Sequence, residues 1–311
     1  MQERSGSAGN DGFNKVTFAR DAVATIDGQL KRTLRLLSDL PPADWERGTA
    51  CTDWRVRDIA AHLADLALNY ARSVALGIRG TPTPFLGLDF PNAEAFRKWR
   101  RGQLLELAPS RPRVLVDLIA SEWDVANGYF KGLVAKMIAF EALGGNPPKP
   151  GEEDSGGGVG PLDALAWHAT GNWPAARFIG MALFELAIHD WDIRAPADPD
   201  ATLNPDVERV LLKFVRQWPT YLVRNESIVG PDGGIRLKLG GAEPDLDLGL
   251  RDGQVVAEVP NPSATIATDP TTFLLVGSGR RTPVEAAARR AWRVTGDESE
   301  AARIIGIYRG L

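Results

Sequence analysis

Cysteine and histidine are scarce in this chain of 311 residues, which contains one cysteine, Cys51, and three histidines. A single cysteine excludes a disulfide within the chain and a cluster of thiolate metal ligands, so sulfur chemistry must use Cys51 or an external thiol. Cys51 precedes a predicted helix, whose positive end can lower the pKa of a thiol. A free cysteine is, however, more commonly a small, partly buried core residue.

Long apolar runs and an excess of positive charge are also missing. No run reaches the roughly 18 to 20 apolar residues of a membrane span, and residues 1–15 lack the apolar stretch of a secretory signal. We therefore expect a cytoplasmic protein with no membrane partner. The formal net charge of −4 argues against nucleic-acid binding, which needs a clustered positive surface. Small molecules are the expected partners.

The first two thirds of the chain show the apolar spacing of amphipathic helices, with steps of three and four residues. Thr52 or Asp53 is expected to cap the second of these helices, which carries His62. Residues 162–170 are expected to form a further short helical piece. The predicted longer helices cover residues 16–37, 54–76, 93–108, 114–143, 174–193 and 207–222.

Two segments lack any periodic apolar signal. Residues 1–12 are polar and predict a disordered tail. Residues 144–161 are rich in glycine, proline and acidic residues and predict a flexible loop, for which disorder is favoured over a functional lid.

From about Ser227 the period changes to the alternation typical of strands. Strands are predicted at residues 235–239, 246–250, 255–259 and 264–268, followed by helices at 271–276, 283–291 and 298–308. The sequence thus predicts a two-domain α+β protein: a helical domain at residues 13–225 and a smaller α+β domain at 226–311, with an antiparallel sheet and helices on one face.

The segment 184–194 combines Glu185, His189 and Asp192. Residues four apart lie on one helix face, so Glu185 and His189 can bind a single ion, with His62 from a second helix as the third ligand. A glutamate and a histidine four residues apart are usually only solvated neighbours on a helix. Here, however, two of the three histidines in the chain belong to the proposed ligand set, which favours a metal site. Asp192 or Asp65 can accept the remaining N–H of a ligating imidazole.

The third histidine, His168, either completes the ligand set, lines the cleft or is a satisfied histidine between helices, which is the commonest outcome. On the helix of His62, Asp58, Asp65 and Asn69 share the histidine's face and are candidates to line the cleft. Tryptophans near the motifs, including Trp54, are explained by core packing, and the arginines of residues 97–101 by a solvated helix face.

At residues 49–65 and 184–194 the chain resembles the mycothiol-dependent maleylpyruvate isomerase family of the DinB-like superfamily. The resemblance includes a Cys-x-x-Trp motif, here Cys51 to Trp54, ahead of the helix with the first histidine. It also includes Glu-x-x-x-His-x-x-Asp, here Glu185, His189 and Asp192. The 144–161 segment departs from the family pattern.

The resemblance implies a DinB-like four-helix bundle that binds a divalent metal, usually zinc with nickel, iron or manganese as alternatives, through His62, Glu185 and His189. It also implies a sterol-carrier-like C-terminal domain and a thiol cofactor, mycothiol or another small thiol. In the family's isomerases the thiolate adds to a conjugated double bond. Arg280, which ends the segment 273–280, is expected to hold a substrate carboxylate, with Arg281 as the rival.

Two imidazoles and one carboxylate leave a position open on the ion, which is the layout of a catalytic site. We therefore predict a metal- and thiol-dependent isomerase or S-transferase acting on a small carboxylate or electrophile, as a monomer or homodimer. A metal-dependent hydrolase on the same bundle and a non-catalytic carrier of a small molecule or lipid are the alternatives.

Overall fold

The computed structural model describes residues 13–83, 90, 93–144, 160–169, 171–223, 230–240 and 244–308. The predicted tail of residues 1–12 and all but the ends of the predicted 144–161 loop lie outside these ranges. The chain divides into two compact units. Ala19–Leu211 form one, here called the helical unit, and Met1–Phe18 with Leu212–Leu311 form the other, here called the sheet unit.

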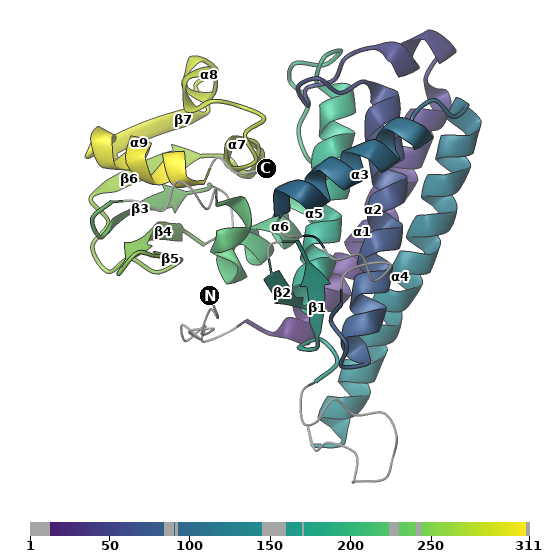
Figure 1. The fold of residues 1–311 in the computed structure, drawn as a ribbon. Coiled ribbons are helices and arrows are strands. Elements are labelled where there is room, and N and C mark those ends of the chain that lie inside the picture. The colour runs from purple at the N-terminus through teal and green to yellow at the C-terminus, as the bar shows by residue number, and fades with distance from the viewer. Residues whose placement is uncertain are drawn as a thin grey trace. The chain divides into compact units, whose positions relative to one another are not determined.

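The predicted long helices are present within a few residues of their expected bounds (Figure 1). They are α1 (Lys15–Asp39), α2 (Val56–Ile78), α3 (Ala93–Leu107), α4 (Pro112–Ala142), α5 (Ala175–Arg194) and α6 (Pro205–Gln217). Among the described residues, two short 3-10 helices, η1 (Pro42–Glu46) and η3 (Pro219–Leu222), accompany them, and η3 replaces the last turn of the helix predicted over 207–222.

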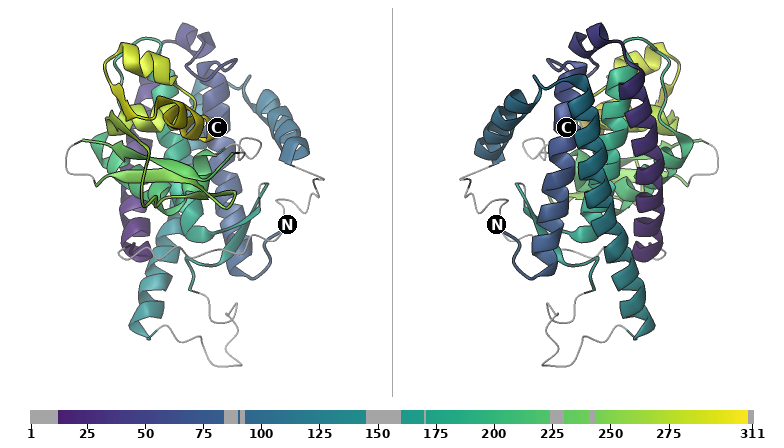
Figure 2. Two further views of the ribbon diagram at one scale, coloured as in Figure 1. Left: turned by 90° about the vertical axis from the view of Figure 1, so that its left-hand side faces the viewer. Right: turned by 90° about the vertical axis from the view of Figure 1, so that its right-hand side faces the viewer.

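The long helices of the helical unit run side by side (Figure 2). α2 packs against α4 and α5, and Trp123 of α4, which is fully buried, donates its indole N–H to the carbonyl of Leu63 over 2.9 Å. α1 is joined to α5 by the hydroxyl of Thr33, which donates to Asp190 over 2.9 Å. Burial of each large apolar side chain contributes roughly 1.5–3 kcal/mol, so these interfaces form the core.

The start of α2 differs from the sequence prediction. Asp53 adopts a left-handed conformation with φ of 65°, and Arg55 is the N-cap residue. The carboxylate of Asp58 accepts a hydrogen bond from the backbone N–H of Arg55 over 2.9 Å. Asp58 therefore caps α2 from within its first turn and pairs with Arg55, so neither Thr52 nor Asp53 caps the helix.

The segment 162–170 is not helical. Residues Leu165–His168 form strand β1, which pairs in antiparallel register with β2 (Gly171–Pro174). Gly171 has φ of 136°, a conformation that L side chains rarely adopt, so the turn of the hairpin depends on glycine. β1 packs against α2, and this contact selects strand over helix in a segment too short for periodicity to decide.

The sheet unit contains a five-stranded sheet in the order β5-β4-β3-β6-β7. Its strands are β3 (Gly233–Lys238), β4 (Leu246–Arg251), β5 (Gln254–Val256), β6 (Ala264–Thr268) and β7 (Trp292–Gly296). The pairs are antiparallel except β3 with β6, which is parallel. The sheet is therefore mixed, and not wholly antiparallel as expected. The helices are α7 (Pro270–Gly277), α8 (Pro283–Ala288) and α9 (Glu298–Ile307), and α9 packs against β3, β4, β6 and β7.

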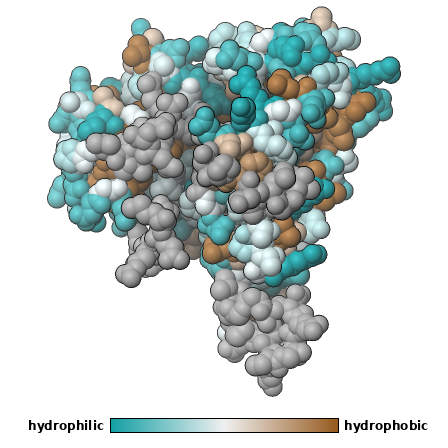
Figure 3. Space-filling model, viewed as in Figure 1, coloured by the Kyte–Doolittle hydropathy of each residue, from teal (hydrophilic) through white to brown (hydrophobic). Residues whose placement is uncertain are grey.

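The surface of the helical unit is mixed in character. Figure 3 shows hydrophobic residues among hydrophilic ones over this unit, and α4 exposes about half of the surface of Val125, Tyr129 and Ile138. Within the ranges that the structure describes, no helix is both long and apolar enough to cross a membrane.

Candidate metal centre

Helix α5 positions three of the predicted site residues. Of its twenty residues only Glu185 and Arg194 are not buried, as expected for a helix with apolar residues on all sides. Glu185, His189 and Asp192 follow one another at steps of four and three, so their side chains lie along one face. The helix thus presents two carboxylates and an imidazole on one face, with His189 and Asp192 buried and Glu185 partly buried.

His62 reaches the same point from α2. Its Nε2 atom lies 3.4 Å from Oε2 of Glu185, and Nε2 of His189 lies 3.3 Å from the same oxygen. One ligand atom from each of the three residues lies within 4.8 Å of the other two. The predicted set of His62, Glu185 and His189 is therefore brought together.

The separations match the edges of a tetrahedral metal site. Two ligand atoms bound at about 2.0–2.1 Å to a tetrahedral ion lie about 3.3–3.4 Å apart, which agrees with the 3.4 and 3.3 Å nitrogen–oxygen distances here. The same distances are long for N–H···O hydrogen bonds, whose usual range ends near about 3.2 Å. The donor set of two imidazoles and one carboxylate therefore fits a divalent ion.

The ring of His62 has an unsatisfied nitrogen that supports this fit. Its Nδ1 atom is buried and has no hydrogen-bond partner. Burial lowers the pKa of His62 to about 4, although Glu185 opposes the shift. The neutral ring carries its one proton on either nitrogen. With the proton on Nε2, Nδ1 is an acceptor without a donor; with the proton on Nδ1, the Nε2 lone pair faces the Glu185 carboxylate and is repelled by it. A cation bound to Nε2 would remove this repulsion.

Glu185 and His189 are held in their charge states by each other. Burial raises the pKa of Glu185, but hydrogen bonds from His189 and His62 outweigh it and hold the pKa well below its usual value. Burial likewise lowers the pKa of His189, but hydrogen bonds to Asp192 and Glu185 outweigh it, so this pKa is raised. Glu185 is thus an anionic ligand at neutral pH.

Asp192 and Trp54 fix the orientation of the His189 ring. Nδ1 of His189 lies 2.9 Å from Oδ2 of Asp192, so the proton on Nδ1 leaves Nε2 free to face Glu185. The rings of Trp54 and His189 are nearly parallel, with 5.7 Å between ring centroids and 6° between ring planes. The Trp54 ring meets the His62 ring edge-on, with 5.1 Å between centroids. Trp54 therefore contacts both imidazoles, a role that core packing did not predict.

Cys51 belongs to a second group of possible ligands. Its sulfur and one atom each of His189 and Asp192 lie within 4.8 Å of one another. The backbone N–H of Ala50 donates to the carbonyl of Asp192 over 3.0 Å, which ties this loop to α5. Because Nδ1 of His189 is already hydrogen-bonded to Asp192, a metal here would break that bond, and the set with His62 is favoured.

Asp65 lies on the predicted face of α2 but serves another partner. Its carboxylate accepts two hydrogen bonds from Arg100, at 2.6 and 3.0 Å, and one from the side chain of Asn69 at 2.9 Å. Asp65 is therefore not the acceptor for an imidazole that we expected. Arg100 is also not part of a solvated face, since its side chain is only 16% exposed.

A small cavity of about 20 Å³ lies further along the interface of α2 and α5. Its polar lining includes Asn69, Tyr70, Ser73, Arg100 and His168, and the Oδ1 atom of Asn69 is buried without a hydrogen-bond partner. This volume is enough for about one water molecule. His168 thus lines a cavity and is not in the candidate ligand set.

Few features of the sequence indicated this cavity. Tyr70 and Arg100 come from α2 and α3, and Phe178 of α5 closes the cavity against the ring of Tyr70, at 5.4 Å between ring centroids. Only the polar residues Asp65 and Asn69 on the face of His62 pointed to it. Asn69 lies seven residues, about 10 Å along the helix axis, from His62.

Arg280 belongs to the sheet unit. It follows α7, is partly buried, and its Nη1 donates to the carbonyl of Ser278 over 3.1 Å. Arg281 donates to the hydroxyl of Thr272 over 3.5 Å. The role of either arginine toward a substrate carboxylate stays a prediction.

Comparisons with known proteins by sequence and by structure agree with each other. Residues 27–136 match the family model of the mycothiol maleylpyruvate isomerase N-terminal domain. The solved structure of a mycothiol-dependent maleylpyruvate isomerase aligns with a TM-score of 0.55 and 16% identity, over 92% of this chain and 94% of that chain. A variant of that enzyme with one histidine replaced by alanine aligns over the same shares with 15% identity. No curated protein matches the sequence.

The matched domain contains His62 and Trp54, and the structural alignment covers 92% of this chain. The resemblance that the two motifs indicated is confirmed: residues 27–136 match the mycothiol maleylpyruvate isomerase N-terminal domain, and the chain has the fold of mycothiol-dependent maleylpyruvate isomerase.

Proposed function

We propose that this chain is a divalent-metal-dependent enzyme that uses a small thiol, mycothiol or a related compound, as cofactor or co-substrate. Its reaction is an isomerisation or an S-transfer on a small carboxylate or electrophile. The observation that carries the proposal is the convergence of His62, Glu185 and His189 at separations that suit one metal ion. The domain match and the shared fold support the thiol.

In this proposal His62, Glu185 and His189 hold the ion. Zinc is the first choice because two imidazoles and a carboxylate with an open position are its usual catalytic set, and nickel, iron and manganese are the alternatives. A bound divalent ion would lower the pKa of a coordinated thiol, and so supply the nucleophile that either reaction needs.

The chain's own residues prepare the site for this chemistry. Asp192 holds a proton of His189 on Nδ1, so that the Nε2 lone pair would be available to an ion shared with Glu185. Trp54 lies against both histidine rings and limits their contact with water. The side chains of His62, Glu185 and His189 are 12%, 18% and 4% exposed, so the site is largely dry. In such surroundings charge interactions are stronger than in water.

Arg280 is proposed to bind a carboxylate of the substrate, because a guanidinium can donate two parallel hydrogen bonds to it. Replacing Arg280 with alanine should raise KM for an anionic substrate more than replacing Arg281. The reverse order would assign the role to Arg281.

Metal analysis of purified full-length protein tests the ligand assignment. Wild-type protein should contain about one ion per chain, and the His62→Ala and His189→Ala variants should contain little. The matched control is His168→Ala, which removes the third histidine and should leave the metal content unchanged. A full complement of metal in either ligand variant would contradict the proposal.

Activity assays with and without thiol test the reaction class. Turnover of an electrophilic or unsaturated carboxylate only when a small thiol is added would support the isomerase or S-transferase. Thiol-independent hydrolysis would favour the hydrolase alternative, in which water takes the open position. Ligand binding that is unchanged in the metal-free His62→Ala, His189→Ala double variant, without turnover, would favour a carrier.

A further inference from the structure

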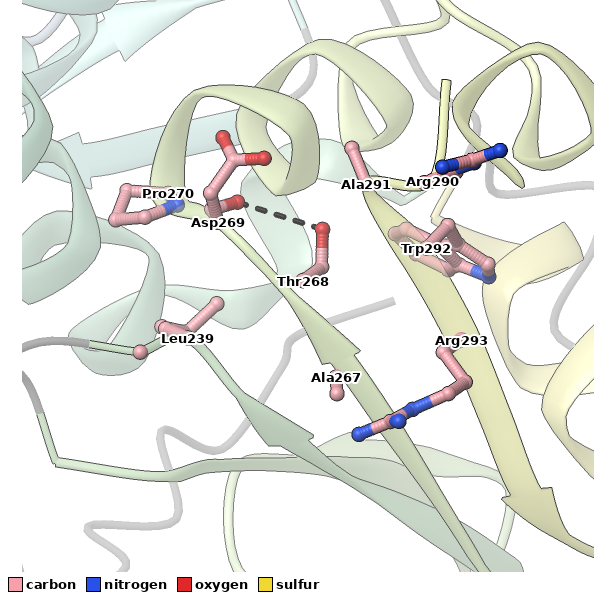
Figure 4. Close-up of a pocket in the computed structure, with 10 residues that line it drawn as sticks. Leu239, Ala267, Thr268, Asp269, Pro270, Arg290, Ala291, Trp292 and Arg293 are labelled. Carbon is pink, nitrogen blue, oxygen red and sulfur yellow. Dashed lines mark hydrogen bonds between the residues drawn. The ribbon is translucent and has the colours of Figure 1, made fainter. Parts of the chain in front are cut away.

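The cavity of the sheet unit and the cavity beside α2 differ in how their charged groups lie. The sheet-unit cavity has a volume of about 890 Å³, and its lining includes Arg290, Trp292 and Arg293. Figure 4 shows Arg290 and Arg293 on opposite sides of Trp292, so the two cations do not converge on one ligand group. The lining of the cavity beside α2 contains Arg100, which also binds the carboxylate of Asp65.

The two histidines of the candidate metal centre are each followed, three residues later, by an aspartate. These pairs are His62 with Asp65 on α2 and His189 with Asp192 on α5. Both histidines have Nε2 near the same oxygen of Glu185, at 3.4 and 3.3 Å. On a helix a side chain leans toward the preceding turn, so an aspartate three positions later can reach the imidazole. The same arrangement is therefore available on both helices.

Only the pair on α5 is hydrogen-bonded in this structure. Oδ2 of Asp192 lies 2.9 Å from Nδ1 of His189, whereas Nδ1 of His62 is buried and has no partner among the described residues. The corresponding carboxylate on α2, that of Asp65, is bound by Arg100 of α3 at 2.6 and 3.0 Å. An unpaired polar atom in a buried position is costly, so an acceptor at Nδ1 of His62 would stabilise the site.

The ion pair of Asp65 and Arg100 lies beside the small polar cavity. The two side chains are 17% and 16% exposed, and the amide of Asn69 donates to the other oxygen of Asp65 over 2.9 Å. Arg100 and Asn69 also line the cavity of about 20 Å³, together with Tyr70 and Ser73. A carboxylate that enters from this cavity therefore meets the same two donors that bind Asp65.

An exchange of carboxylates solves the problem of space. The cavity alone has room for about one water molecule, which is less than a carboxylate needs. If Asp65 turns from Arg100 toward His62, however, the carboxylate of a ligand can take the place that its own carboxylate leaves. Arg100 then keeps one anion, and Nδ1 of His62 gains an acceptor. The exchange also places a negative charge beside an imidazole that would bind a cation, which strengthens that imidazole as a ligand.

From these contacts we propose that Arg100 is an anion-binding residue of the helical unit and that Asp65 is its exchangeable partner. A small carboxylate replaces Asp65 at Arg100 and Asn69, and Asp65 then accepts the Nδ1–H of His62 as a positioning residue. Anion binding and metal binding therefore strengthen each other. The inference rests on the proposed function, because it needs a metal on His62, but not on Arg280, which belongs to the sheet unit.

The zinc affinity of the full-length protein, measured by competition with a chromophoric chelator, tests the coupling. The titration is done in sodium acetate and in sodium chloride at equal ionic strength, and the weak binding of zinc by acetate itself is subtracted. Wild-type protein should bind zinc about tenfold more tightly in acetate, which is within the usual range for coupled sites and for hydrogen bonds that support a metal ligand. Equal affinity in the two salts would overturn the proposal.

Two variants break the same ion pair but should have different effects on zinc. Arg100→Gln releases Asp65 to His62, so zinc affinity should be about tenfold higher in chloride than for wild-type protein, and acetate should add nothing. Asp65→Ala leaves His62 without an acceptor, so its affinity should equal that of wild-type protein in chloride and should not respond to acetate. A merely structural role of the ion pair predicts equal losses of affinity in both variants, and that result would overturn the proposal.

The matched control is Arg101→Gln, because Arg101 is next to Arg100 on α3 but is exposed. It should bind zinc and respond to acetate as wild-type protein does. A gain of affinity in acetate that persists in Arg100→Gln and Asp65→Ala would place acetate on the ion itself and overturn the proposal. A protein that binds no zinc in either salt contradicts the proposed function, whereas zinc binding that ignores acetate contradicts this inference alone.

The imidazole signals provide a second measurement. The chain has three histidines, so NMR of histidine-labelled, zinc-loaded protein can follow each ring separately. Acetate should add a hydrogen-bonded Nδ1–H signal for His62, and this signal should stay absent in Asp65→Ala. In Arg100→Gln it should be present without acetate. If Arg100→Gln does not fold, wild-type protein and Asp65→Ala still decide the matter, because no new Nδ1–H signal in the wild type, or the same signal in both, would overturn the proposal.

Discussion

Nδ1 of His189 lies 2.9 Å from Oδ2 of Asp192, and the Asp192 side chain is fully buried. A buried carboxylate that accepts the N–H of a ligating imidazole fixes its tautomer and raises its basicity as a ligand. Because the two residues are three positions apart on α5, one turn of helix creates both the ligand and its support.

Replacing Asp192 with asparagine should lower metal affinity about 10- to 100-fold, which is the usual effect of losing such a support. A competition titration with a chromophoric chelator measures the change. Asp65→Asn is the matched control, since Asp65 lies near on α2 but is hydrogen-bonded to Arg100 and Asn69. Equal losses of affinity in the two variants would show that Asp192 acts only through general charge.

His168 should make the metal-free protein less stable in acid. Burial, with the nearby charges of Arg177 and Arg100, lowers the pKa of His168 to about 4, from an ordinary value of 6.5. Between these values the unfolded chain binds the extra proton and the folded chain does not, so stability is complete above pH 6.5 and falls as the pH approaches 4.

The His168→Gln variant removes this titration. Its free energy of unfolding should depend less on pH than that of the wild type between pH 6.5 and about 4, by on the order of 2 kcal/mol after allowance for partial exposure. Urea unfolding of the metal-free proteins across this range provides the measurement. Parallel curves for the two proteins would show that His168 does not titrate in this way.

Local spacing explains how much of the site could be predicted from sequence. Glu185, His189 and Asp192 lie on one helix, and helical geometry alone places them on one face. His62 is 123 residues from Glu185, so no periodicity could bring the two together, and the pairing rested on the scarcity of histidine and on the family resemblance. The role of Arg280 depends equally on a long-range relationship and stays a prediction.

The errors share the same origin. Residues 162–170 were predicted to be helical, but β1 pairs with β2 and packs on α2. This long-range contact is not visible in the local sequence pattern. Asp65 accepts hydrogen bonds from Arg100, 35 residues away on α3, and not from an imidazole as predicted. The parallel pairing of β3 with β6 likewise requires a crossover that strand alternation cannot indicate.

The close approach of α2 to β1 should make Gly77 sensitive to substitution. A Cβ atom at Gly77 would lie 2.9 Å from Cα of Ala166 and closer still to the carbonyl oxygen of Leu165. Gly77→Ala should therefore destabilise the protein by about 1–3 kcal/mol, as overpacking usually does. Thermal or urea unfolding measures the loss.

Gly128 provides the matched comparison for Gly77. It lies in α4, and an added Cβ would meet nothing within 4 Å. Gly128→Ala should stabilise the protein by roughly 0.5–1 kcal/mol, because alanine loses less conformational freedom in a helix. A stable Gly77→Ala protein would show that β1 can move away from α2.

The contacts of Trp54 with both histidines predict an effect on the rate of metal release. Its ring is stacked on His189 and edge-on to His62, so Trp54→Ala should let both imidazoles move and open the ligands to water. Each aromatic contact contributes about 0.5–1.5 kcal/mol, so the loss of both should make metal dissociate roughly 5- to 150-fold faster in a chelator-chase measurement. Trp54→Phe keeps an aromatic ring against both histidines and should release metal at close to the wild-type rate. Equal rates for wild type and Trp54→Ala would show that the imidazoles are held by Asp192 and Glu185 without help from the indole.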